Sequence, residues 1–474
     1  MAPSVLGMTS RHVAVVRAPR TTTLTGWGRA HRAVASVLAP TADDDLAAQV
    51  AACSDLLTAR GAGCSYGDAA LPTDRPTTVV DTTHRDRVVD LDLDTGVVVV
   101  QSGATLARIQ ALVVPHGWTL PVVPGTARVT VGGAVGSDVH AKNQPGAVTF
   151  GHHVRWLTLV RPDGTTLRLA PDHRPEAFWA TVGGMGLTGL IDLVCLRLHP
   201  IPSPMMACTR RRTGDLAETV AVLEQLAQAQ AGDPDEHVVA WVDASAGTRG
   251  GRAIIDSARP VSTDGVDDPG YAVPDSRPAP LSLPGPGVVG RTSIRAANRA
   301  RWWLGSRPSE RVATISRTLH PLDRAGAWPA AFGSGGLVQY QLVVPPAAPD
   351  ALAEVLAVLR RFDCPPALAT LKRFTSTPAS LLAFAVPGWA LALDFPARWS
   401  ALEPALRALD ALVADVGGRV YLTKDGRLPR AAVHRMYPHL EQWRRERALL
   451  DPDGRWVSSL GARTGLVDLP EATR

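Results

Sequence analysis

Lysine is nearly missing from this chain. Of its 474 residues, 49 are lysine or arginine, and only three of these are lysine: Lys142, Lys372 and Lys424. Positive charge is therefore carried by arginine, and a remaining lysine is a candidate for work that a planar, permanently charged guanidinium does badly. Each lies in a stretch that attracts attention on other grounds, with Lys142 on an expected loop. Chance scatter of so few residues is the alternative interpretation.

Cysteine is scarce, and it lacks the spacing of metal sites and disulfide frameworks. The five cysteines form no CxxC pair, and their number is odd. Both features argue against a disulfide framework and against a zinc site. We therefore expect that the protein binds no metal and that it works in a reducing compartment.

Long basic runs and long apolar runs are missing too. The densest basic run is RRR at 210–212 and the net charge is only +5, so nucleic acid is not an expected partner. No apolar run reaches about 18 residues, which predicts no transmembrane helix. The first 25 residues carry no continuous apolar core, so we expect no secretory signal and a cytoplasmic location.

The first half of the chain alternates short apolar strands with glycine-rich turns. Residues 1–20 read as a flexible tail and residues 21–200 as a first domain. The stretch 121–143 holds four glycines and is expected to be mostly irregular. The other expected elements are a strand at 55–60, paired strands at 88–103 around a turn at 94–96, a helix at 106–117, a hairpin at 154–170 and a strand before 200.

The second half has the pattern of an α+β domain. Residues 205–415 alternate helix-period and strand-period segments, which predicts an antiparallel sheet backed by helices. Residues 257–290 hold seven prolines and are expected to form a mobile loop within this domain. Residues 417–474 are expected to return to the first domain, largely as helices. Helices are predicted at 215–230, at 349–361 and up to 416, and strands at 238–245, 336–345, 367–374, 389–396 and 419–423.

Glycine-rich segments recur in the first domain. GAGCSYGD at 61–68 follows a predicted strand, and glycines let backbone N–H groups gather around an anion. Two similar segments follow at 124–133 and 182–184. Three such loops on one domain favour a long, phosphate-bearing ligand. A loop-rich surface without a ligand is the alternative.

Polar side chains occur on four predicted strands of the second domain. Gln339 and Gln341 flank Tyr340 in one strand, so both amides point to the same face. Polar groups that share a sheet face form either a pocket floor or a solvated surface, and both interpretations stay open. The other members are Lys372, Asp394, Tyr421 and Lys424.

A lone histidine, His140, follows Asp138 in the glycine-rich stretch. Such a residue is more often structural than catalytic. The neighbouring glycines would nevertheless let a ligand approach closely, so both roles are open.

Together these segments resemble the vanillyl-alcohol-oxidase-type flavoproteins, which bind FAD in a two-part N-terminal domain. Within that group the chain is most similar to the decaprenylphosphoryl-β-D-ribose 2′-oxidase family, and the resemblance covers nearly the whole chain. The matching stretches are LTGWGR (24–29), ARGAGCSYGD (59–68), PGTARVTVGGAV (124–135), DVHAKN (138–143), FWATVGGMGLTG (178–189), LVQYQLVVP (337–345), PGWALALDFP (387–396), GGRVYLTKDGR (417–427) and MYPHLEQW (436–443).

The resemblance implies a site for FAD built mainly from the first domain. The residues implied to hold it are Ala59, Arg60, Gly61, Ala62, Gly63, Cys64, Ser65, Tyr66, Gly67, Asp68, Gly125, Thr130, Val131, Gly132, Gly133, Ser137, Asp138, His140, Ile191 and Tyr421. Many covalent flavoproteins of the wider group carry a flavin-linked histidine where Cys64 stands. FAD is therefore expected to be noncovalent.

The resemblance also implies hydride transfer from a sugar carbinol carbon to flavin N5, with a base taking the hydroxyl proton. A cation at Lys424 would favour the negative charge that builds on the reduced ring. The implied catalytic residues are Tyr66, His140, Gln341 and Lys424, and the implied substrate contacts are Leu319, Gln339, Lys372, Ala392 and Asp394.

Three substrate-side positions depart from the family pattern. Ala392 replaces the cysteine to which covalent inhibitors attach, Ala390 replaces an asparagine, and Leu319 replaces a tyrosine. These departures concern the choice of substrate and leave the expectation of FAD untouched.

The main hypothesis is an FAD-dependent oxidoreductase that acts on a secondary alcohol of a sugar. The resemblance implies that this sugar is linked to a polyprenyl phosphate and is a precursor of cell-wall arabinan. A sugar-lactone or polyol oxidase of the same fold is the alternative. A third hypothesis is a non-catalytic flavin-binding partner protein. The presence of Lys424, Gln341 and His140 argues against it. The resemblance further implies a short-chain reductase partner that completes an epimerisation, and a peripheral membrane contact.

Overall fold

The computed structural model describes residues 17–469, except for 231, 246–249, 263–284, 286, 306–308, 325–327 and 349. The expected tail therefore lies outside the described residues up to position 16. Its last residues correct the prediction, since Arg17 donates to the side chains of Asp44 and Gln49 and the first strand begins at Arg20. Of the expected loop, residues 257–260 belong to a strand, while 263–284 and 286 lie outside the described part.

The chain begins with a small mixed sheet in the order β1-β2-β4-β3. The inner strand β4 runs parallel to both of its neighbours, whereas β1 and β2 form an antiparallel pair. The crossover between β2 and β3 contains helix α1, which is capped by the side chain of Asp45. The bounds are β1 Arg20–Thr25, β2 Arg32–Leu38, α1 Leu46–Ala51, β3 Leu56–Arg60 and β4 Thr77–Asp81.

A second, antiparallel sheet follows in the order β5-β6-β10-β8-β9. Both predicted hairpins form as expected, and a two-stranded ribbon of β7 and β11 lies apart from this sheet. The strands are β5 Val88–Asp92, β6 Val97–Gln101, β7 Trp118–Thr119, β8 Val154–Val160, β9 Thr166–Leu169, β10 Leu190–Arg197 and β11 His199–Pro200. The helices are α2 Leu106–Val113, α3 Val131–Gly136, α4 Gln144–Ala147 and α5 Pro175–Thr181.

Helix α3 occupies six residues of the stretch 121–143, and the remainder of that stretch is irregular, as expected. Three of them are glycine, which disfavours a helix in isolation. The side chain of Thr130 caps the helix by accepting from the amide of Gly133, and Ala134 and Val135 are fully buried. Tertiary packing and the cap therefore outweigh the local propensity.

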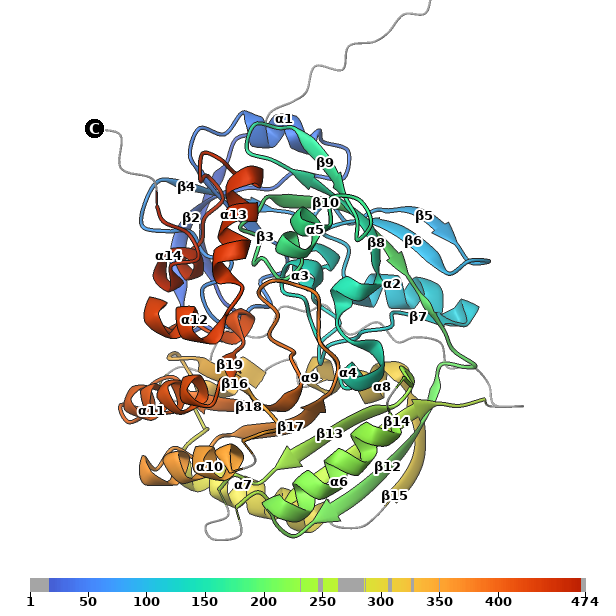
Figure 1. The fold of residues 1–474 in the computed structure, drawn as a ribbon, viewed down its shortest axis with the longest axis vertical. Helices are drawn as coiled ribbons and strands as arrows, with labels where there is room; N and C mark the ends of the chain where they lie inside the picture. The colour runs from blue at the N-terminus through green and yellow to red at the C-terminus, as the bar shows by residue number, and fades with distance from the viewer. Residues whose placement is uncertain are drawn as a thin grey trace, which may run out of the picture.

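The third sheet has eight strands, all antiparallel, in the order β15-β12-β14-β13-β17-β18-β16-β19 (Figure 1). This confirms the predicted antiparallel sheet. The strand predicted at 419–423 is shorter than expected, because Leu422–Lys424 form a 3-10 turn. The bounds are β12 Met205–Thr213, β13 His237–Val242, β14 Ala253–Pro260, β15 Ser309–Thr314, β16 Leu337–Val344, β17 Leu368–Phe374, β18 Gly388–Pro396 and β19 Arg419–Val420.

Helices cover one face of this sheet on the side away from the two N-terminal sheets (Figure 1). Side chains such as Val222, Val355 and Leu409 on these helices share one apolar core with Val238 and Ala240 of β13. The opposite face of the sheet points toward the first half of the chain. The covering helices are α6 Leu216–Ala229, α10 Ala351–Arg361 and α11 Leu402–Asp415. Helices α7 Arg291–Leu304, α8 Ile315–Leu319 and α9 Pro321–Arg324 lie in the segment between β14 and β16.

The last helices return to the first sheet, beside the blue strands in Figure 1. The amide of Leu57 in β3 donates to Arg455 and its carbonyl accepts from Val457, while Trp456 between them is fully buried. The helices are α12 Arg430–Met436, α13 Leu440–Leu450 and α14 Ser459–Thr464. No helix among the described residues has the length and apolar character needed to cross a bilayer.

Candidate active site

A cavity of about 870 Å³ lies between the N-terminal sheets and the open face of the eight-stranded sheet. The loop after β3, helix α3 and β10 line it on one side. Strands β12 to β18 and helices α7 and α8 line it on the other. Both halves of the chain therefore contribute to a single site, of the size that holds a cofactor together with a substrate.

Strand register explains which polar side chains reach the cavity. Gln341 lies opposite Ala392, Ala392 opposite Thr370, and Thr370 opposite Trp241. Directly opposed residues of antiparallel strands point to the same face. This row of four therefore faces the cavity together, from strands that are far apart in the sequence.

The loop at 61–65 has the features of an anion cradle. It lines the cavity, and within the described chain none of its five backbone amides has a hydrogen-bond acceptor. A Cβ on Gly61 would collide with Thr130 Oγ1, and Gly63 has a φ of 66°. Side chains larger than hydrogen are therefore disfavoured at both positions, and free N–H groups face a ligand. These features fit the phosphates of FAD.

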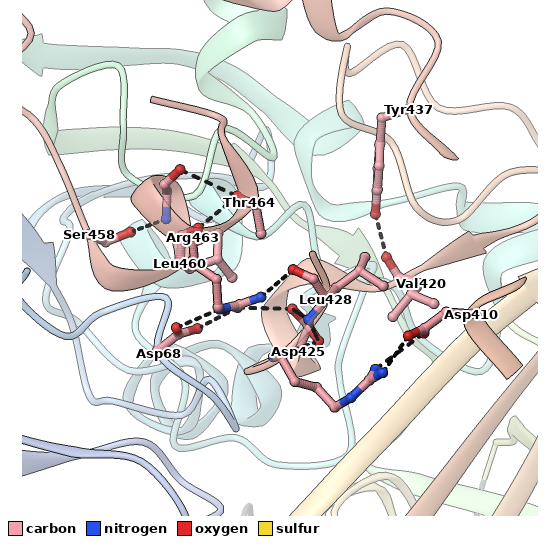
Figure 2. A network of polar contacts seen from close by, with 12 residues as sticks. Asp68, Asp410, Val420, Asp425, Leu428, Tyr437, Ser458, Leu460, Arg463 and Thr464 are labelled. Atoms are coloured by element: carbon pink, nitrogen blue, oxygen red, sulfur yellow. Dashed lines mark hydrogen bonds and ion pairs between the residues drawn. The ribbon is translucent and has the colours of Figure 1, made fainter. Parts of the chain in front are cut away.

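The end of the glycine-rich loop is held in place through Asp68 by Arg463 of α14 (Figure 2). Its guanidinium donates to both carboxylate oxygens of Asp68, at 2.8 and 3.0 Å, and forms an ion pair with Asp425 at 3.0 Å. Gly67 packs so closely that a Cβ there would collide with the carbonyl of Asp425. One arginine thus fixes the glycine-rich loop relative to the turn that carries Lys424.

His140 lies at the centre of the cavity between the two halves. Its Nε2 is 2.9 Å from Nε2 of Gln341, and its Nδ1 is 3.5 Å from Nζ of Lys372. The rings of Phe374 and Tyr421 lie 4.9 and 5.4 Å away. Burial and the nearby lysine charges hold the pKa of His140 well below its usual value. The imidazole is therefore neutral at physiological pH.

All three lysines line this cavity. Burial lowers the pKa of Lys372 to about 7, helped by the charges of Lys142 and Lys424. Burial also lowers the pKa of Lys142 and of Lys424 to about 8. In the described part of the chain, no carboxylate forms an ion pair with any lysine. The cavity is therefore electropositive and suited to anionic ligands.

Lys424 lies in the 3-10 turn after β19. Its Nζ is 4.0 Å from the centre of the Tyr66 ring, which is a cation–π distance. Tyr66 belongs to the glycine-rich loop, so this contact joins the predicted FAD cradle to the second half of the chain. Tyr421, in the same turn, donates its hydroxyl to the carbonyl of Ser137 at 2.8 Å.

The structure brings most of the predicted site residues to the cavity. Ala392 and Leu319, two of the positions that depart from the family pattern, both line it. The lining residues among the predictions are Ala59, Arg60, Gly61, Ala62, Gly63, Cys64, Ser65, Tyr66, Gly125, Thr130, Gly132, Gly133, Ser137, His140, Ile191, Leu319, Gln339, Gln341, Lys372, Ala392, Tyr421 and Lys424.

Other predicted residues do not line the cavity, and the structure shows them in contacts that support it. Gly67 and Asp68 support the loop as described above, and Val131 is buried in the core of the second sheet. Asp138 accepts from Ser380 at 2.6 Å and from the amide of Gly151 at 3.1 Å.

Asp394 is likewise a supporting residue. Its carboxylate accepts from Gln339 Nε2 at 2.6 Å and from Trp328 Nε1 at 3.0 Å, and both donors line the cavity. Burial raises the pKa of Asp394. The carboxylate fixes the Gln339 amide from behind, so it orients a cavity residue without lining the cavity itself.

Lys142 lies on a turn, as expected, and its Nζ donates to the carbonyls of Thr318 and Leu319 at 3.0 and 3.4 Å. A further group of polar residues was not predicted. Arg210, Asp256 and Arg301 also line the cavity. Asp256 follows the apolar residues Ala253–Ile255 in β14, and Arg210 opens the basic run 210–212, so neither residue stands out in the sequence as a cavity residue.

Comparison with known proteins supports the assignment of this site. Residues 34–170 match the FAD binding domain family. Over 455 residues the chain is 33% identical to the decaprenylphosphoryl-β-D-ribose oxidase of Mycolicibacterium smegmatis, covering 94% of this chain and 97% of that protein. An uncharacterized protein of Streptomyces coelicolor is 34% identical over 76% of this chain and 100% of its own length. An uncharacterized FAD-linked oxidoreductase of Mycobacterium tuberculosis is 29% identical over 30% of this chain and 32% of its own.

The structural and sequence findings agree on the cofactor. The glycine-rich loop with free amides lies inside the matched FAD binding domain, so FAD is the cofactor of this enzyme. The similarity to the Mycolicibacterium oxidase extends through the second half of the chain, which supplies the other wall of the cavity. The chain therefore belongs to the decaprenylphosphoryl-β-D-ribose oxidase family of FAD-dependent oxidoreductases.

Proposed function

We propose that this enzyme oxidises a secondary alcohol of a polyprenyl-phosphate-linked pentose to a ketone. The observation that carries the proposal is the convergence of His140, Lys372 and Lys424 on one cavity, opposite the glycine-rich loop. In the reaction the carbinol C–H and O–H bonds break and the C=O bond forms. FAD, when bound, accepts the hydride with its two electrons. The protein must therefore position the alcohol, take up its proton and balance the new charge.

Lys372 is the residue best suited to take the hydroxyl proton. A general base works best when its pKa is close to the operating pH. The pKa of Lys372 is about 7, so part of the population carries a neutral amine at neutral pH. His140 is neutral too, but its strongly lowered pKa makes it a weaker base. Tyr66 holds its proton, since burial raises its pKa well above the usual value.

His140 and Gln341 are suited to orient the substrate hydroxyl. The two side chains are fixed against each other at 2.9 Å, and aromatic rings restrict the imidazole. A fixed pair of polar groups lowers the entropic cost of holding a reacting alcohol. Lys424 adds a fixed ammonium that stabilises negative charge developing in a site sheltered from water.

The charge of the cavity favours a phosphate-linked sugar over a neutral lactone or polyol. Three half-buried lysines without an ion-paired carboxylate among the described residues would be costly to keep unless a ligand supplied negative charge. The phosphates of FAD supply part of this negative charge. The related Mycolicibacterium enzyme is named for oxidation of a decaprenylphosphoryl ribose, which carries a phosphate.

A ketone product implies a further step. Inversion at the oxidised carbon would require a second enzyme that returns a hydride to the opposite face, and a short-chain reductase has that chemistry. We include such a partner in the proposal. A prenyl chain on the substrate would also place the reaction at a membrane surface, so peripheral membrane association is part of it.

The experiment is anaerobic reduction of the FAD-loaded enzyme by a panel of prenylphosphoryl pentoses and free polyols. Loss of flavin absorbance reports reduction in a single turnover. The proposal expects reduction by a prenylphosphoryl pentose and little by the polyols. Faster reduction by polyols or aldonolactones would favour the alternative oxidase.

A further inference from the structure

The cavity continues past the reactive centre into an arm over strands β12–β14 and helix α7. Arg210, Asp256 and Arg301 line this arm, and Lys142 lies where it meets the centre. Lys142 is the residue whose charge acts most strongly on Lys372, which in turn lies beside His140. The arm is therefore the next part of the cavity beyond the proposed position of the reacting alcohol.

The arm holds more positive than negative charge. Arg210 and Asp256 neutralise each other through two hydrogen bonds of 2.6 and 2.8 Å. Arg301 packs on the Trp241 ring at 4.9 Å, and no described residue accepts a hydrogen bond from its guanidinium. Lys142 donates to two carbonyls, which leaves one N–H of its ammonium group. Among the described residues neither cation has an ion-pair partner, and the Asp256 charge that acts on both is shared with Arg210.

A third polar atom in the same place, a histidine nitrogen, lacks a partner. His237 is 8% exposed, lines the cavity, and its Nδ1 has no hydrogen-bond partner. A buried polar atom of this kind ordinarily costs free energy unless a ligand or water satisfies it. Burial and the charge of Lys142 lower the pKa of His237 to about 3, so the ring is neutral and carries one N–H. It adds a hydrogen-bond donor without adding charge.

We propose that this arm binds the phosphate of the substrate, with Arg301 and Lys142 as its charged contacts and His237 as a neutral donor. Arginine and lysine beside a neutral N–H match the oxygens of a phosphate ester. The inference rests on the proposed function, because it places the phosphate in the arm next to the proposed position of the sugar alcohol. It makes the arm the part of the site that distinguishes phosphorylated sugars from free ones.

The test uses the FAD-loaded full-length enzyme and two readouts. The variants are Arg301→Gln and Lys142→Met. The matched control is Arg299→Gln, which removes the same charge from an exposed position on the same helix outside the cavity. The first readout is binding of ribose 1-phosphate and of ribose by calorimetry. The second is kcat/KM for flavin reduction by farnesylphosphoryl ribose and by methyl riboside.

Wild type and Arg299→Gln should bind ribose 1-phosphate more tightly than ribose. Arg301→Gln and Lys142→Met should each lose roughly ten- to a hundredfold of that affinity, the usual value of one charge-assisted hydrogen bond. Their kcat/KM should fall further for farnesylphosphoryl ribose than for methyl riboside. A variant can lose as large a factor in affinity for ribose 1-phosphate as in kcat/KM for farnesylphosphoryl ribose. That result would identify the phosphate, and not the prenyl chain, as the recognised group.

The phosphate site would be overturned if all four proteins bound ribose 1-phosphate and ribose alike. It would also be overturned if Arg301→Gln and Arg299→Gln behaved the same. Failure of the proposed function looks different, because no sugar would then reduce the flavin in wild type. Calorimetry would still decide the phosphate site in that case.

Discussion

Nζ of Lys372 lies 3.5 Å from Nδ1 of His140. Two basic groups so close together in a buried cavity cannot both hold a proton at low cost. Burial holds the pKa of both below their usual values, to about 7 for the lysine. The arrangement provides an amine that gains and loses a proton near neutral pH, beside an imidazole that stays neutral.

The pH profile of flavin reduction follows from this pair and from Lys424. Lys372 must be deprotonated to accept the hydroxyl proton, so the rate should rise as pH passes about 7. Lys424 must be protonated to stabilise negative charge, so the rate should fall as pH passes about 8. We expect a narrow bell with its maximum between these values, measured as kcat/KM in stopped flow.

Variants separate the two limbs of this profile. Lys372→Met should remove the rising limb and reduce the rate. Lys424→Met should move the rising limb to higher pH, because the charge of Lys424 lowers the pKa of Lys372. A rising limb unchanged in Lys372→Met would show that another group is the base.

Lys424 should be the side chain with the largest single effect on turnover. Its loss removes a fixed cation from a sheltered site, which typically costs roughly a hundred- to a thousandfold in rate. Lys424→Ala should keep FAD and reduce slowly with substrate, and Lys424→Arg should recover little because a guanidinium is larger and planar. Arg445→Ala, at an exposed position on α13, is the control. Wild-type flavin reduction in Lys424→Ala would refute the proposed role of this residue.

FAD should be bound without a covalent link. Cys64 stands where many relatives of the wider group carry a flavin-linked histidine. Burial raises the pKa of its thiol to about 11, so the reactive thiolate is scarce at neutral pH. Acid precipitation should release FAD into the supernatant. Flavin that stays with the precipitated protein would show that the link exists.

Inhibitors that trap the family's cysteine should bind this enzyme reversibly. Ala392 occupies that position on β18, between Gln341 and Thr370, and it lines the cavity. Mass spectrometry after incubation with a nitroaromatic inhibitor should find no adduct in residues 387–396. Ala392→Cys should create one, since the new thiol would face the cavity. An adduct in the wild-type segment would contradict the prediction.

The local features of the site could be predicted from sequence because they depend on short-range patterns. The period-two alternation of 336–345 and 367–374 placed Gln339, Gln341 and Lys372 on strands, as observed. Their meeting in one cavity depends on the order β13-β17-β18-β16. The spacing of residues along the chain does not reveal the order of the strands. The sequence therefore could not decide whether these polar residues form a pocket floor or a solvated surface.

The features that could not be predicted have the same physical origin. Asp68 reads as part of the cofactor loop, but its partner Arg463 lies 395 residues away and converts it into a support. Lys142 lies on a loop as expected, but the carbonyls that fix it come from α8 and could not be inferred from its neighbours in sequence. Helix α3 contains three glycines, and it is stabilised by the cap by Thr130, by burial of its apolar side and by hydrogen bonds from its amides to the carbonyls of Ser102 and Ala104. Each of these depends on long-range packing or on a cap that outweighs propensity.

The most direct test of the account is a deuterium isotope effect on flavin reduction. Farnesylphosphoryl ribose would be prepared with protium or deuterium at C2 and mixed anaerobically with the FAD-loaded enzyme. We expect that the flavin is reduced and that deuterium at C2, or at C3 in a second preparation, slows the reduction several-fold, since the C–H bond of the oxidised alcohol breaks in the hydride step. No reduction, or reduction that deuterium slows at neither carbon, would contradict the proposed function.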